Sequence, residues 1–194
     1  FYDFLKERQF NIQRQQVDFL KNALKVKAYI ANLNNEANLN LQPFRQELDV
    51  VDAHIYHDHP TYPLQNWNVP ISKSAIASGN EAMLNNMRIR IPGKPMIATE
   101  LQFCYPNRFR SEIAPLAGAY AAMQDWDAIY RFAYGHSTDK ISRPTPVTTF
   151  DHFYDPIGIL SGRIIYFLFV RGDVAPAEGP IVCYGWNDPA YDDK

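Results

Sequence analysis

Residues 94–110, KPMIATELQFCYPNRFR, are the stretch on which the predicted fold depends. A short apolar run follows a Gly-Lys-Pro turn, and this pattern predicts a buried β-strand from Met96 to Glu100. A carboxylate at the end of such a strand is costly unless it is paired or used. Where parallel strands alternate with helices, catalytic groups gather at the carboxyl ends of the strands. Glu100 is therefore the first candidate for a catalytic residue.

The clearest strand of the chain lies upstream, at 48–56, LDVVDAHIY. Apolar and polar residues alternate along it, as in a strand whose two faces meet different surroundings. The polar face carries Asp52, His54 and Tyr56, and the apolar face is expected to pack in the core.

Helical and strand patterns alternate along the rest of the chain. The predicted helices cover 3–24, 41–48, 74–86, 113–124 and 157–170, and the predicted strands cover 26–31, 48–56, 96–100 and 126–134. This alternation predicts an α/β fold with a parallel sheet, in about four βα units behind a leading helix. A complete (β/α)8 TIM barrel takes about 250 residues, so the pattern is similar to the second half of one.

The domain organisation follows from this pattern. Residues 1–174 are predicted to form the carboxyl-terminal half of a barrel, and 175–194 to form a linker that can lead into a following module. The chain starts within a helical pattern and without Met, so we expect the native start to lie upstream. An isolated half-barrel would expose sheet edges, which predicts that it needs the missing half or a partner chain.

Composition excludes some classes of function. The net charge of −2 gives no electrostatic reason to expect nucleic acid or an anionic membrane as a partner. No apolar run reaches the length of a membrane span. The 14% aromatic content suits both sugar binding and an ordinary core. Cys104 and Cys183 match no metal or redox motif, and their number leaves both the disulfide question and the cellular compartment open.

Three passages carry a family resemblance. They are LDVVDAHIYHDHP at 48–60, KPMIATELQFCYPNRFRSE at 94–112 and AYAAMQDWDAIYRFAY at 119–134. They resemble strands six, seven and eight of the (β/α)8-barrel retaining glycoside hydrolases of the cellulase- and β-galactosidase-like clan. The resemblance covers about residues 20–175, and it implies an O-glycoside hydrolase that acts on an oligo- or polysaccharide without a cofactor.

The resemblance also implies roles for single residues. Glu100 would be the nucleophile, with His54 and Tyr56 beside it. Tyr134 would line the sugar site at the end of strand eight, where many relatives carry Trp. A retaining mechanism needs two carboxyl groups about 5–5.5 Å apart, and hydrogen-bond donors such as Tyr and His keep the attacking one ionised.

The second carboxyl group has no clear candidate in this chain. In the clan it is a Glu that follows Asn at the end of strand four, and Asn-Glu occurs here only at 35–36 and 80–81. Glu36 is too close in sequence to strand 48–56, so we expect it on the loop after strand five, in contact with substrate. The acid/base is therefore expected upstream. The alternative is a non-catalytic half-barrel that binds carbohydrate or serves as a scaffold.

Further residues are candidates for substrate binding. They are His57, Trp67 in the proline-rich loop after strand 48–56, and Asn107 in the passage similar to strand seven. His54, His57 and His59 could together suggest zinc, but strand alternation separates them and no Glu lies among them at a known zinc spacing. We therefore predict no metal site.

Overall fold

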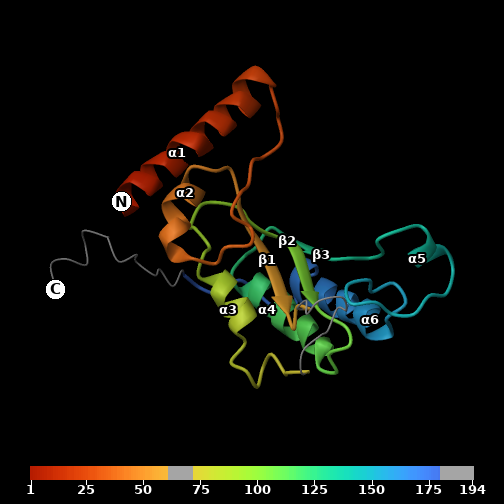
Figure 1. Cartoon of the computed structure of the whole chain (residues 1–194). Coiled ribbons are helices and arrows are strands. Elements are labelled where there is room, and N and C mark those ends of the chain that lie inside the picture. Colours follow the sequence, from red (N-terminus) through yellow and green to blue (C-terminus); the bar gives the residue numbers. More distant parts are fainter. Residues whose placement is uncertain (61–71, 180–194) are drawn as a thin grey trace.

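The computed structural model describes residues 1–60 and 72–179 (Figure 1). The elements in chain order are α1 (Tyr2–Asp18), the π-helical η1 (Phe19–Ala23), the 3-10 turn η2 (Leu39–Leu41), α2 (Gln42–Gln46), β1 (Val51–His57), α3 (Glu81–Met87), β2 (Met96–Phe103), the 3-10 turn η3 (Arg110–Glu112), α4 (Ile113–Met123), β3 (Ala128–Arg131), α5 (Asp139–Ser142), α6 (Pro156–Ile165) and the π-helical η4 (Tyr166–Val170). The fold is mixed α/β, which confirms the predicted class.

The sheet has three parallel strands in the order β1-β2-β3 (Figure 1). Helix α3 lies in the connection from β1 to β2, and α4 lies in the connection from β2 to β3. Each connection is therefore a βαβ crossover, as parallel neighbours require. The predicted helices 3–24, 41–48, 113–124 and 157–170 are confirmed, with shifted ends.

One face of the sheet is packed against helices and forms the core. Its alternate residues are fully buried, and they join α3, α4 and α6 in one apolar cluster; the members from the sheet are Val51, Ala53, Ile55, Met96, Ala98, Leu101 and Phe103. Helix α4 is rich in Ala, and it contributes Ile113, Ala114, Leu116, Ala117 and Ala121 to this cluster. The opposite face carries the polar side chains of β1, as the alternation predicted.

A β-bulge in β2 determines on which face of the sheet the Glu100 side chain lies. Ala53 pairs with Ala98, but His54 pairs with Glu100, so Thr99 is the extra residue. The bulge shifts the alternation by one residue and places Glu100 opposite His54 on the polar face.

The sequence predicted that Glu100 is the last residue of its strand, and this prediction is wrong. Strand β2 continues to Phe103, because Leu101 and Phe103 are buried in the core and the ladder to β1 extends to His57. The side chain of Glu100 therefore starts three residues before the carboxyl end of β2.

The predicted strand 26–31 is wrong. The backbone of 26–31 is irregular, and Lys25 and Leu33, which flank it, have left-handed φ values of 56° and 66°. This irregular segment still lies along β1, because Ile30 O accepts from Asp49 N at 3.1 Å and Asn34 O accepts from His54 N at 2.7 Å.

The other predicted strand, 126–134, is shorter in the structure. Only Ala128–Arg131 is β-structure. Trp126 is buried in the core before the strand begins. After the strand, Ala133 N donates to Phe150 O at 2.9 Å, so the backbone leaves the sheet for a different partner.

Arg45 organises the loop that follows the irregular segment. It is fully buried, and its guanidinium donates to the carbonyl oxygens of Leu33, Glu36 and Asn38. Burial lowers the pKa of this Arg, with the nearby Glu36 acting in the opposite direction. The side chain ties residues 33–38 to α2, next to the middle of β1.

Helix α6 begins with a capped and ion-paired residue. Asp155 Oδ1 accepts from Ile157 N at 3.1 Å, and Arg110 forms two hydrogen bonds of 2.7 and 2.9 Å with the same carboxylate. Burial acts to raise the pKa of Asp155, but the bonds from Arg110 outweigh it and hold that pKa below its ordinary value. The pair joins the loop after β2 to α6.

Candidate active site

Two side chains of β1 contact the carboxylate of Glu100. The Tyr56 hydroxyl donates to Glu100 Oε2 at 2.5 Å, and His54 Nδ1 lies 3.3 Å from the same oxygen. The Glu100 side chain is 29% exposed, so its carboxylate is partly shielded and still open to a ligand. The structure thus brings together the three residues that the sequence analysis placed in the catalytic centre.

A second pair of residues orients His54. The hydroxyl of Thr99 donates to Asp52 Oδ1 at 2.6 Å, and Thr99 N donates to the same oxygen at 3.2 Å. Because this hydroxyl has given its one proton to Asp52, Thr99 Oγ1 accepts from His54 Nε2, which lies 3.1 Å away. The ring is therefore held with Nδ1 toward Glu100, where Nδ1 donates when the imidazole carries both protons.

The hydroxyl of Tyr56 remains a donor to Glu100. Burial, and then the bond to Glu100, raise the pKa of Tyr56 far above its ordinary value. The phenol keeps its proton throughout the physiological range. A carboxylate held by such a donor has the orientation that a nucleophile needs.

Aromatic rings border Tyr56 on the outer side of the site. Phe132, directly after β3, and Phe150, in the loop before α6, meet its ring edge to face, with centroids 6.3 and 5.7 Å away. Their own centroids are 5.6 Å apart. The ring of His59 lies 5.1 Å from Tyr56. Aromatic side chains beside a few polar groups are typical of ligand-binding sites.

Two residues predicted to contact substrate have structural positions instead. His57 follows the alternation onto the core side of β1, where its ring packs 5.0 Å from Phe103 and its Nε2 lies 2.8 Å from Lys73 O. Asn107 is fully buried, and its Nδ2 donates to Lys73 O at 2.9 Å and to Asp58 Oδ2 at 2.5 Å. Both side chains therefore contact the backbone of Lys73, in the connection from β1 to β2.

Tyr134, which the resemblance implies lines the sugar site, lies beyond the end of β3. Its ring is 52% exposed and contacts His152 and Phe153, because the chain has already turned away from the sheet. Phe132, two residues earlier, occupies the place beside Tyr56.

Two further predicted contacts have different outcomes. Glu36 is exposed, in the loop that Arg45 holds, and no described contact joins it to Glu100. Trp67 lies outside the described residues.

Sequence reasoning missed several residues of the site. Asp52 shares the polar face with His54, so alternation was a signal that could have assigned it. Thr99 joins the site only through the bulge, and Phe150 comes from a loop with no periodic pattern. No local signal in the sequence marks those two.

The described part of the chain offers no metal site and no membrane helix. Within residues 1–60 and 72–179, no three His, Cys, Asp or Glu side chains are placed to hold a metal ion together. In the same ranges, every helix is too short or too polar to cross a membrane. Cys104 is fully buried and free, and burial raises the pKa of its thiol to about 12.

Comparison with known proteins adds no relative. The chain matches no family model, no curated protein and no solved structure. The geometry around Glu100 is therefore what indicates a function for this chain.

Proposed function

We propose that this chain carries the nucleophile of a retaining O-glycoside hydrolase that acts on an oligo- or polysaccharide. The observation that carries the proposal is the placement of Glu100. Its carboxylate lies near the carboxyl end of a parallel strand, bonded to Tyr56 and adjacent to His54. Aromatic rings beside it offer apolar surface for a sugar.

The proposed chemistry proceeds in two steps. Glu100 Oε attacks the anomeric carbon, the bond to the leaving oxygen breaks, and the acid/base protonates that oxygen. Water, activated by the same acid/base, then hydrolyses the glycosyl-enzyme ester and releases Glu100. Tyr56 and His54 orient the carboxylate in both steps. The reaction needs two carboxyl groups and water, and no cofactor.

For the fold, we propose strands five to eight of a (β/α)8 barrel. The irregular segment 30–34 would take the place of strand five, and β1, β2 and β3 would be strands six, seven and eight. The parallel order, the crossover helices and the polar face opposite those helices support this assignment. Residues 175–194 remain the proposed linker, of which 180–194 lie outside the described residues.

The acid/base would come from a strand outside the four proposed here. Asn80 is buried at the start of α3, and Glu81 is exposed on that helix, which packs on the core side of the sheet. Glu36 is exposed in its loop and is proposed at most as a substrate contact. A non-catalytic carbohydrate-binding or scaffold module is the second candidate, because neither Glu that follows Asn in this chain, Glu36 or Glu81, suits the role of acid/base.

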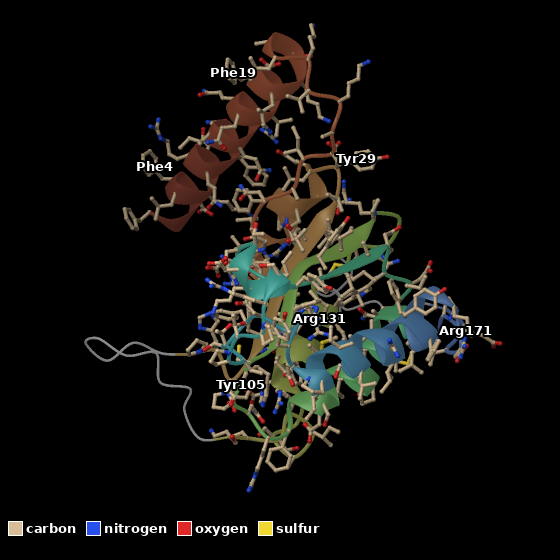
Figure 2. All side chains as sticks on the ribbon, turned by 90° about the vertical axis from the view of Figure 1, so that its right-hand side faces the viewer. Phe4, Phe19, Tyr29, Tyr105, Arg131 and Arg171 are labelled. Atoms are coloured by element: carbon tan, nitrogen blue, oxygen red, sulfur yellow. The ribbon has the colours of Figure 1, made fainter. Side chains whose placement is uncertain are left out.

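We propose that further βα units complete the sheet, either from the same polypeptide or from a partner chain. Exposed apolar side chains on two helical segments support this proposal. Helix α1 packs on α2 through Phe10, yet Phe4 on α1 and Phe19 at the start of η1 are 58% and 55% exposed. Figure 2 shows both side chains directed away from the rest of the protein. On α6, Leu160 and Ile164 are similarly exposed.

Because these apolar faces are uncovered, the chain by itself is expected to self-associate. Sedimentation velocity over a range of concentrations measures this. Replacing Phe4 and Phe19 together by Ser should weaken the association, whereas Tyr29→Ser, at an exposed ring outside α1, should not. A stable, dilute monomer of the unaltered chain would contradict the proposal of a completing partner.

The catalytic proposal is tested by following the release of reducing ends from a panel of plant, algal and bacterial polysaccharides. The longest natural version of the protein is the right material, since it includes any further strands. Release from one class of polysaccharide supports hydrolysis and names the substrate. Binding without release supports the non-catalytic module instead.

Tyr56→Phe is expected to lower kcat by about ten- to a hundredfold, the effect of one strong hydrogen bond to a charged group. The ring contacts with Phe132 and Phe150 remain, so thermal unfolding should change little. Initial rates at saturating substrate give kcat. Tyr154→Phe, at a tyrosine whose ring contacts Phe153 in the loop before α6, is the matched control. An unchanged kcat in Tyr56→Phe would remove Tyr56 from the mechanism.

A further inference from the structure

A His-Asp pair lies beside the rings that border Glu100. His136 Nδ1 and the backbone N of His136 both bond to Asp151 Oδ1, the second at 3.0 Å. The Thr148 hydroxyl donates to Asp151 Oδ2 at 2.8 Å. The described bonds to this carboxylate thus come from the segment between β3 and α5 and from the segment between α5 and α6.

The pair is joined to the site through aromatic rings. The ring of His136 lies 5.1 Å from that of Phe132 and 6.4 Å from that of Phe150. The same two rings contact Tyr56, whose hydroxyl bonds to Glu100. His136 and Tyr56 therefore contact the same two phenylalanine rings, and the described contacts join His136 to the Glu100 carboxylate through these rings.

One nitrogen of His136 is left for a ligand. Asp151 accepts the proton of Nδ1, so in the neutral imidazole Nε2 is an acceptor. No described residue bonds to this nitrogen, and the His136 side chain is 47% exposed while that of Asp151 is only 10% exposed. The carboxylate orients the ring, and the ring presents an acceptor toward solvent beside an aromatic wall.

Asp151 is held in its charged form. Burial acts to raise its pKa, but the hydrogen bonds from His136 and Thr148 outweigh burial and hold the pKa below its ordinary value. Glu100 and Asp151 both contribute carboxylates here, and within the described ranges no Lys or Arg side chain bonds to Glu100, His136 or Asp151. Carboxylates without a bonded Lys or Arg disfavour an acidic sugar, and they suit a sugar that carries hydroxyl groups alone.

We propose that His136, positioned by Asp151, binds a hydroxyl of a neutral sugar unit in a second subsite that Phe132 and Phe150 line beside Glu100. His136 touches the sugar, and Asp151 acts only through His136. The inference rests on the proposed glycoside hydrolase function for its ligand class. It differs from that function in predicting dependence on substrate length.

The test compares two substrates of the same sugar: a chromogenic glycoside of a single unit and a longer neutral oligosaccharide. His136→Ala should lower kcat/KM for the oligosaccharide about tenfold and leave the short glycoside unchanged, because only the long substrate reaches the second subsite. Asp151→Asn should cause a smaller loss on the same substrate. Its effect should vanish when His136 is already Ala, as expected for a residue that acts through another.

Asp139→Asn is the matched control, since this carboxylate lies on the neighbouring α5 and its ion-pair partner among the described residues is the exposed Arg143. It should change neither substrate. Nitrogen-15 spectra of His136 provide a readout separate from activity: the Nδ1-protonated tautomer should dominate in the unaltered protein and lose population in Asp151→Asn. Equal losses on both substrates in His136→Ala, or none, would overturn the subsite.

Binding separates this proposal from hydrolysis. Calorimetry on Glu100→Gln, with and without His136→Ala, measures oligosaccharide affinity where turnover is blocked. If no polysaccharide is hydrolysed but His136→Ala weakens oligosaccharide binding, the subsite stands and the catalytic proposal fails. If hydrolysis occurs and His136→Ala has no length-dependent effect, the subsite fails alone. Absence of binding to every neutral oligosaccharide, or stronger binding of uronic acid oligomers, would also overturn it.

Discussion

Glu100→Gln is expected to lower kcat by about a thousandfold or more, with the fold intact. The amide has nearly the shape of the carboxylate and can still accept from the Tyr56 hydroxyl, so the packing of the site is kept. It cannot attack the anomeric carbon, because it lacks the charge and the basicity of the carboxylate. Reducing-end release by the longest natural version of the protein, wild type against variant, measures the effect.

The control for this variant is Glu81→Gln. Glu81 is exposed in the first turn of α3, a helix on the core side of the sheet, and its replacement should leave the rate unchanged. Circular dichroism and thermal unfolding of both variants check the fold. Equal activity of wild type and Glu100→Gln would move the chemistry to another residue.

Arg45→Met is expected to lower the free energy of unfolding by about 3 kcal/mol, since three backbone carbonyl groups lose the same charged donor together. The buried guanidinium donates to the carbonyl oxygens of Leu33, Glu36 and Asn38, and its removal takes these bonds away. Methionine keeps much of the volume, so a cavity contributes little. Urea unfolding followed by fluorescence measures the change.

Arg14→Met is the matched control for this variant. Arg14 lies on α1 and forms an exposed ion pair with Glu47, which directly follows α2. Its replacement should alter stability little. The Arg45 variant should also lower activity, because Asn34 O, in the segment that Arg45 holds, accepts from the backbone N of His54. Unchanged stability in Arg45→Met would mean that the loop finds other donors.

Local pattern was sufficient where burial on one face sets the structure. The alternation in 48–56 predicted β1 and the side on which Asp52, His54 and Tyr56 lie, because a one-residue slip would bury polar groups. Helix α4 was predicted from its Ala-rich sequence and α6 with η4 from an apolar run, and the two helical segments pack against each other.

Local pattern failed where the chain is irregular. The segment 26–31 contains apolar residues, yet its backbone is irregular, and the side chain of Asp49, rather than a strand ladder, accepts from Ile30 N. Strand 126–134 was predicted too long, because β3 ends at Arg131, and Phe132 is the residue whose ring lies beside Tyr56.

The sequence by itself determined the α/β class, the polar face of β1 and the choice of Glu100, since each depends on residue types that are close together in the chain. Only the tertiary structure decided that Glu100 meets His54 and Tyr56, because the bulge at Thr99 reverses the side that simple alternation gives it. It also decided that His136 meets Asp151 and that Phe150 meets Tyr56. Those contacts join loops distant in sequence, where no periodic pattern constrains the backbone.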